Sequence, residues 1–151
     1  MDNFQKAPEL ATKTLGDALE ASSITILRYA KQYAPHRTGN LWRNIFSETS
    51  GLQARVFVGP QASYAQYVEQ GTGLYGPHDQ LIFPTKARVF ASKRNPGWGS
   101  ANAGGYFIIG KYTKGMEANP FFKRAIDSSK PEVAAIMRDA TATFTRSIGG
   151  L

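Results

Sequence analysis

The stretch PELATKTLGDALEASSITILRYAKQY, residues 8–33, decides the fold class, because its apolar residues recur every three to four positions. This spacing is typical of one face of an α-helix. The charged side chains of Lys13, Asp17, Glu20 and Lys31 cluster on the opposite face. The pattern therefore predicts a long first helix with one apolar stripe. The stripe consists of Ala11, Leu15, Ala18, Leu19, Ser22, Ile26, Tyr29, Ala30 and Tyr33.

Two further apolar residues of this segment, Ile24 and Leu27, do not belong to the stripe and lie on or beside the polar face. We expect either a second element of the same chain or a neighbouring subunit to cover them. Both are therefore candidate interface residues.

The residues after the first helix carry the signals of a helix end and a turn. Pro35 and Gly39 break the helix, and Thr38-Gly39-Asn40 forms a turn. Residues 41–49 fit a short helix that runs into a strand.

A second strand and a short helix follow. Residues 53–58 have the β-branched and aromatic content of a strand, and Gly51 makes a hairpin with the preceding strand plausible. Residues 64–70 fit a short helix, and Gly71 is a typical residue for its C-terminal end.

Three more strand segments are predicted at residues 81–83, 88–90 and 106–109. Residues 93–105 between them are rich in turn-forming residues, and a loop this long is either functional or disordered. Its Trp98 either anchors a partner or folds back on its own sheet.

Residues 105–114, GGYFIIGKYT, come within one residue of the phosphate-binding pattern GxxxxGK[ST]. Tyr112 stands where the magnesium-binding hydroxyl is needed, and residues 106–109 are bulky β-formers in place of a small, open loop. The segment is therefore predicted to be a strand and not the site of an NTPase.

The C-terminal part predicts two helices. Asn119-Pro120 is a helix start for residues 121–128, and Ser129 with Glu132 forms a capping box for a second helix. The apolar stripe of that helix consists of Val133, Met137, Ala140, Phe144 and Ile148.

The order of helix, strands and helices predicts an α+β fold, with a long N-terminal helix and C-terminal helices packed on a small, mostly antiparallel sheet. We expect the core that joins the first and last helices to be formed by Leu15, Ile26, Val133, Met137 and Phe144.

Length and composition are those of one folded domain. The chain has 151 residues, and we expect residues 1–151 to form a single domain with a long flexible loop at about residues 93–104. No apolar run is long enough to span a bilayer, and the first ten residues lack the apolar segment of a secretory signal. We therefore expect a soluble, non-exported protein without membrane contact.

Few residues suit catalysis or metal binding. The chain has no cysteine, and its two histidines, His36 and His78, lie in Pro/Gly-rich connections without a helical partner histidine. No acid, base or nucleophile stands at a recognisable catalytic spacing. We expect no enzyme activity, no cofactor and no metal site.

The net charge of +7 comes from one region of the chain. Residues 80–124 contain eight basic residues and one acidic residue, whereas the rest of the chain has ten of each. A clustered positive charge indicates an anionic partner, either nucleic acid or an acidic protein face, although a solvated surface explains it equally well. The candidate contacts in this region are Lys86, Arg88, Lys93, Arg94 and Trp98.

Three segments together resemble the gene-product-ten family of HK-type tailed phages, neck or tail-completion proteins also likened to minor tail protein Z. They are YAPHRTGNLWRNI (33–45), YAQYVEQGTG (64–73) and KGMEANPFFKRAI (114–126). The chain departs from the family pattern at Trp42 and Gln70. The matching residues are Ala34-Pro35, Thr38-Gly39, Leu41, Tyr64-Ala65, Glu69, Gly71-Thr72-Gly73, Gly115 and Pro120-Phe121.

The resemblance implies a virion structural protein that is made in the host bacterial cytoplasm and joins capsid to tail at the head–tail junction. Subunits would form a six-fold or twelve-fold ring around the DNA channel, and DNA would be a further contact there. Other partners would be connector, stopper, tail terminator or tail tube proteins. The residues of the family pattern that we expect to maintain the fold are Pro35, Thr38, Gly39, Tyr64, Glu69, Gly71, Thr72, Gly73, Pro120 and Phe121.

A second hypothesis is a stand-alone nucleic-acid-binding module. It would use the basic residues of the segment 80–124, with Tyr106, Phe107 and Tyr112 as stacking platforms for bases. Measurement of particle size with and without DNA separates the two hypotheses, because a ring assembles without nucleic acid.

Overall fold

The computed structural model describes residues 3–82 and 114–149. The chain divides into two compact units. Met1–Ala65 with Pro120–Leu151 form the first, which we call the helical unit, and Gln66–Asn119 form the second, the loop unit. The predicted strands at residues 88–90 and 106–109 and the loop at 93–104 lie outside the described residues, as do five of the candidate contacts. These five are Lys86, Arg88, Lys93, Arg94 and Trp98.

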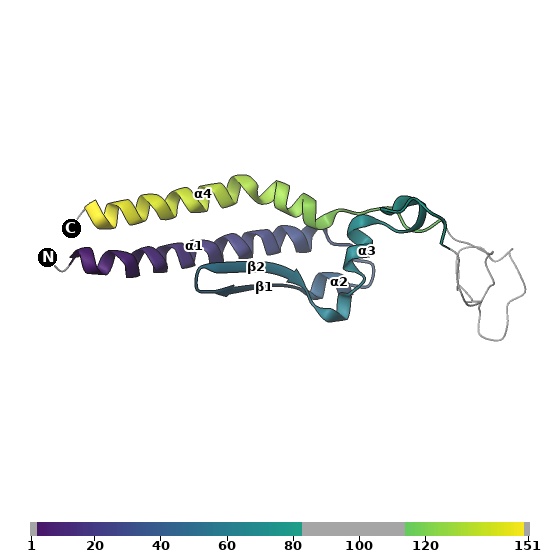
Figure 1. The fold of residues 1–151 in the computed structure, drawn as a ribbon, viewed down its shortest axis with the longest axis horizontal. Coiled ribbons are helices and arrows are strands. Elements are labelled where there is room, and N and C mark those ends of the chain that lie inside the picture. Colours follow the sequence, from purple (N-terminus) through teal and green to yellow (C-terminus); the bar gives the residue numbers. More distant parts are fainter. Residues whose placement is uncertain (1–2, 83–113, 150–151) are drawn as a thin grey trace, which may run out of the picture. The chain divides into compact units, whose positions relative to one another are not determined.

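Two long helices dominate the helical unit. The first, α1, runs from Asn3 to Tyr33, and the second, α4, runs from Phe121 to Gly149. They lie side by side in opposite directions, and a β-hairpin lies along the other side of α1 (Figure 1). The α+β fold class is therefore confirmed, with α1 as the central element between α4 and the hairpin.

The two helices approach each other through small residues. Ala18, Ser22 and Thr25 of α1 are buried. Their spacing of three and four residues places them on the same side of the helix as Tyr29. The buried Ser22 hydroxyl donates to the Ala18 carbonyl oxygen at 2.7 Å, so it needs no partner across the interface. Small side chains allow the helix axes to approach, and the local hydrogen bond removes the cost of burying the hydroxyl.

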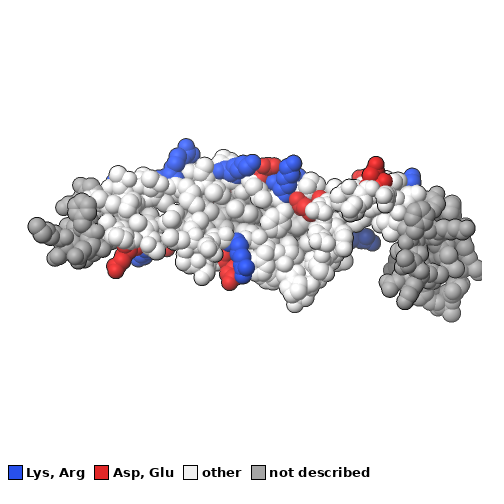
Figure 2. All heavy atoms as spheres, viewed as in Figure 1, with Lys and Arg blue, Asp and Glu red and all other residues white. Residues whose placement is uncertain are grey.

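Polar contacts fix the register of α1 against α4. The Arg28 guanidinium lies 2.6 Å from the Glu132 carboxylate, and the Tyr33 hydroxyl lies 3.0 Å from the Ser128 hydroxyl. The Arg124 guanidinium stacks over the Tyr33 ring at 5.3 Å from its centroid. In the view of Figure 2, charged side chains gather mainly along the margins of the helical unit.

The ion pair between the helices should contribute little to stability. We expect Glu132→Gln to lower the free energy of unfolding by no more than about 1 kcal/mol, because the side chains of Arg28 and Glu132 are 61% and 39% exposed and water screens their attraction. Urea unfolding of the variant measures this. A loss several times larger would mean that the pair is shielded from solvent.

The hairpin consists of β1, Ile45–Ser50, and β2, Gln53–Val58, in antiparallel register. Alternate residues face α1 and solvent, as a half-buried sheet requires. Gly51 in the turn has a φ of 57°. A Cβ on Gly16 of α1 would lie 3.7 Å from the Gly51 carbonyl oxygen, which places the hairpin turn against the first helix.

The two apolar residues found off the predicted stripe differ in exposure. Leu27 is half-buried, whereas Ile24 remains 53% exposed beside a hollow that Ser23, Ser47 and Thr49 help to line. The hypothesis that a neighbouring subunit covers Ile24 stays a prediction.

The fully buried core lies at the end of the helix pair where α1 stops and α4 begins. Short elements complete this region: α2, Asn40–Arg43, and the 3-10 helix η1, Pro60–Ala62. The largest side chains with almost no exposure are Phe121 at 1%, Leu41 at 2% and Ile45 at 0%. The other apolar residues of this core are Ala30, Ala34, Ala62 and Ala125.

The predicted core was wrong in its position. Leu15 is 43% exposed, and Ile26, Val133, Met137 and Phe144 are only half-buried. The physical reason is that α4 and the hairpin pack on two sides of α1, and the centre of the predicted stripe lies between these two contacts.

The predicted division of the C-terminal part into two helices was also wrong, because α4 continues through Ser129 and Pro131. Ser129 is buried and its hydroxyl donates to the Ile126 carbonyl oxygen at 3.0 Å, so it acts inside the helix and not as a cap. Glu132 does not complete a capping box, since its carboxylate binds Arg28 of α1. Packing along α1 overrides the local capping signal.

Candidate interaction site

The turn before α2 is built around a glycine. Gly39 has a φ of 69°, a left-handed conformation that side chains disfavour. A Cβ at this position would lie 2.9 Å from the Arg43 guanidinium, which donates to the Thr38 carbonyl oxygen at 3.3 Å. Thr38 and Gly39 therefore shape the turn that directs the buried Leu41 into the core.

Two asparagines, of which the sequence analysis named only Asn40, as a turn residue, join this turn to the next segment. The Asn40 side-chain amide donates to the Gln61 carbonyl oxygen at 3.1 Å and to the Tyr64 hydroxyl at 3.3 Å. The Asn44 amide donates to the Asn40 side-chain oxygen at 3.1 Å. Asn40 belongs to the predicted turn, but its partners follow it by more than twenty positions, so a local pattern could not identify them.

Exposed aromatic residues mark the surface of the helical unit. On the solvent side of the hairpin, the Phe46 and Phe57 rings are 6.0 Å apart, and the Arg55 guanidinium lies 5.2 Å above the Phe57 ring. Arg55 also pairs with Glu48 on the opposite strand at 2.6 Å. Phe46 and Phe57 are 44% and 37% exposed. Such aromatic side chains are enriched in protein interfaces.

A second aromatic group surrounds Trp42, which is 40% exposed. The Lys31 ammonium lies 5.5 Å from the centroid of its ring, and the His36 ring is tilted against it at 6.3 Å. This residue, at which the chain departs from the family pattern, is therefore held by α1 while part of its ring remains available to a partner.

In the loop unit, two segments distant in sequence run beside each other. The helix α3, Ala65–Gln70, leads into Gly71, and the 3-10 helix η2, Gly73–Tyr75, follows. Thr72 binds Met116 twice: its N–H donates to the Met116 carbonyl oxygen at 2.8 Å, and its hydroxyl accepts from the Met116 N–H at 2.9 Å. The Leu74 N–H donates to the Lys114 carbonyl oxygen at 2.8 Å. We call residues 71–74 and 114–116 the glycine crossing.

Three glycines make this close approach possible. Gly71, Gly73 and Gly115 have φ values of 77°, 67° and 95°. A Cβ on Gly73 would fall directly on the Lys114 carbonyl oxygen, and a Cβ on Gly115 would fall directly on that of Thr72. Only glycine fits at these positions, both for conformation and for space.

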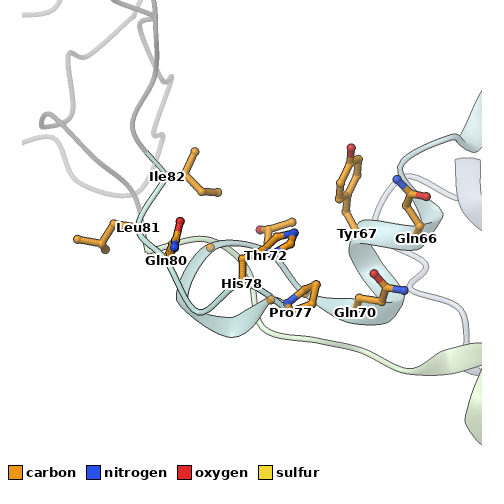
Figure 3. Close-up of a pocket in the computed structure, with 12 residues that line it drawn as sticks. Gln66, Tyr67, Gln70, Thr72, Pro77, His78, Gln80, Leu81 and Ile82 are labelled. Atoms are coloured by element: carbon orange, nitrogen blue, oxygen red, sulfur yellow. The ribbon is translucent and has the colours of Figure 1, made fainter.

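Beside the glycine crossing lies an open hollow of about 480 Å³. Figure 3 shows Tyr67 of α3 at one end and Ile82 at the other, with Pro77 and His78 between them. The polar lining comes from Gln66, Gln70, Thr72, His78 and Gln80, and none of the lining residues is acidic. The hollow can therefore accept apolar and hydrogen-bonding groups of a partner.

The structure brings some of the predicted motif residues together and leaves others apart. Gly71, Thr72 and Gly73 meet in the glycine crossing, and Asn40 links Tyr64 to the turn formed by Thr38 and Gly39. Phe121 is buried in the core, whereas Pro35 and Pro120 are half-buried. A role of Glu69 in maintaining the fold stays a prediction.

In the part of the chain that the structure describes, no three His, Asp or Glu side chains are grouped to hold a metal ion. Within the same residues, no helix is long and apolar enough to cross a membrane.

Comparison with protein families gives one match. Residues 1–71 match the model of the family described as "Bacteriophage HK97-gp10, putative tail-component". Over these residues the chain is similar to the HK97 gp10-like family. The gp10-like segment contains α1, α2, the hairpin and α3, and it ends at the first glycine of the glycine crossing. A search of curated proteins and a search of solved structures found no match.

The gp10-like match confirms the suspected family. It favours a structural component of a phage tail, with a place in the virion, partners among other tail or neck proteins, and a role without catalysis.

Proposed function

We propose that the protein forms a ring at the head–tail junction of a tailed phage and joins the capsid to the tail around the DNA channel. The observation that carries this proposal is the gp10-like match over residues 1–71. The exposed aromatic residues of the hairpin and of Trp42 support it, because a junction protein must bind neighbours on more than one side.

A ring requires two different, complementary surfaces on every subunit, because each subunit binds one neighbour with the first surface and the other neighbour with the second. The helical unit offers the outward face of the hairpin, and the loop unit offers the hollow beside the glycine crossing. These surfaces would bind the next subunit or the adjoining neck and tail proteins.

The test is a phage in which this gene is inactivated. We expect filled heads and tails to accumulate separately, and we expect the protein supplied from a plasmid to restore joined particles, as counted by electron microscopy. Joined, infectious particles in the absence of the protein would contradict the proposed function.

The copy number is tested separately by native mass spectrometry of the purified protein, with six or twelve subunits as the expected result. The nucleic-acid-binding hypothesis predicts instead that the protein is small without DNA and binds DNA with an affinity that falls steeply with salt, because neutralised phosphates release counterions.

A further inference from the structure

One side of the α1–α4 pair, which we call the open flank, carries a continuous row of apolar residues. On α1 the row contains Leu15, Leu19 and Ile26, at intervals of four and seven. On α4 it contains Ile126, Val133, Met137, Phe144 and Ile148, at alternating intervals of seven and four. Intervals of this kind keep side chains on one side of a helix.

The other elements of the helical unit cover these residues only in part, and Leu19 lines a hollow together with residues of the hairpin. The hairpin and α4 lie on opposite sides of α1 (Figure 1). Helical spacing places the row on α1 between the side of Tyr29, which reaches Glu132 of α4, and the side of Ser23, which lines the hollow beside β1. Leu15, Ile126 and Ile148 are 43%, 46% and 36% exposed, and the remaining members are half-buried.

The open flank is also almost free of charge. On the face that Figure 2 shows, the surface of the helical unit is white along most of its length, with Lys, Arg, Asp and Glu at its margins. One marginal pair is Lys130 with Asp127, whose atoms lie 2.6 Å apart. The hydrogen bond and the charge of Lys130 hold the pKa of Asp127 below its ordinary value, so this carboxylate is ionised and paired at neutral pH.

The area of the open flank is similar to the area that one partner buries in a stable protein–protein interface. A helix of 29 residues, the length of α4, is about 44 Å long. Two helices whose axes are 8–10 Å apart present a face roughly 15–20 Å wide, which gives about 700–900 Å². This is close to the ~800 Å² that each partner contributes to an interface of standard size. Only part of this area is apolar and accessible in the subunit, since Leu15, Ile126 and Ile148 are the exposed members of the rows and the others are half-buried.

We infer that a second copy of this chain covers the open flank, as a lateral contact between subunits. The inference rests on the proposed ring, and it specifies which surface of the subunit makes the contact. An uncharged face offers no basis for selecting DNA or a strongly charged protein. It does suit the surface of an identical subunit, which carries exposed aromatic side chains, such as Phe46 and Phe57, on the hairpin.

The test introduces a carboxylate into the flank at positions that tolerate it in the monomer. Leu15→Glu and Ile126→Glu change exposed residues, so both variants should retain the helical circular dichroism and melting behaviour of the unassembled subunit. Each should weaken self-association at least roughly 30-fold, because it buries an unpaired charge in the contact. Analytical ultracentrifugation over a range of protein concentrations measures the dissociation constant.

The matched control is Ile24→Glu. Ile24 is also an exposed isoleucine of the helical unit, but it lies beside the hollow next to β1, away from the open flank. This variant separates the inference from the hypothesis that a neighbouring subunit covers Ile24: if the contact lies on the open flank, it assembles as the wild type does. If Ile24→Glu dissociates the oligomer while both flank variants assemble normally, the contact lies on that other side of α1 and the inference is wrong.

Two other results would also overturn the inference: a wild-type protein that is monomeric at every concentration, and flank variants that assemble like the wild type. Failure of this surface differs from failure of the proposed function. If the inactivated phage needs the protein but both flank variants restore joined particles and normal oligomers, the junction role stands and only the surface is wrong. If the phage does not need the protein, the junction role itself is wrong.

Discussion

Replacing Phe121 with alanine should lower the free energy of unfolding by about 3–5 kcal/mol. Phe121 is the largest side chain with almost no exposure, at 1%, and its ring contacts that of Phe122 edge to face at 5.4 Å. The variant loses this buried surface and leaves a cavity where α4 begins. Urea unfolding followed by circular dichroism, at a fixed protein concentration, measures the loss.

Phe144→Ala is the matched control, because it removes the same side chain from the same helix at a half-buried position. We expect it to cost clearly less than Phe121→Ala when the two are compared as monomers. Equal losses would show that the far end of the helix pair is packed as tightly as the core around Phe121, and this description of the core would be wrong.

The second large effect is expected at the glycine crossing. Gly115→Ala should destabilise the loop unit by at least about 2 kcal/mol, because Gly115 has a φ of 95° and the new methyl group would fall on the Thr72 carbonyl oxygen. Amide hydrogen exchange gives a local measurement: the N–H groups of Thr72, Leu74 and Met116 should lose protection together, since all three bonds cross the same junction.

The hairpin turn provides a control for the conformational part of this effect. Gly51 also has a positive φ, 57°, but nothing lies within 4 Å of the position that a Cβ would occupy. Gly51→Ala should therefore cost only the strain of a left-handed residue, about 1–2 kcal/mol. A Gly115→Ala variant with unchanged protection at Thr72 and Met116 would mean that the two segments separate without cost.

Local patterns were sufficient for the elements whose signals lie close together in sequence. The apolar spacing of residues 8–33 predicted α1, and the strands on either side of Gly51 predicted the hairpin. The pattern failed at Ser129, where a capping signal is overridden by the packing of α4 on α1. Helical spacing also could not show that Leu15 remains exposed, because it identifies which residues share a side and not what covers them.

For the candidate site, patterns of neighbouring residues in the sequence predicted less of the structure. The glycines at positions 71 and 73 were recognisable as turn residues, but the sequence does not show that residues 114–116 run beside them more than forty positions later. Gly115 was noted only as a match to the family pattern. Its necessity follows from the short distance between two backbones, which is a property of the tertiary structure.

The glycine crossing has a consequence for how this part of the chain can change during evolution. Its hydrogen bonds join the two ends of the segment from residue 75 to residue 113. They offset the loss of chain entropy that bringing these ends together requires. Doubling the number of residues in a closed loop adds only about 0.6 kcal/mol. Changes in the number of residues between the two sides of the crossing should therefore cost little stability, whereas the three glycines of the crossing must be kept, because a Cβ there would meet the backbone.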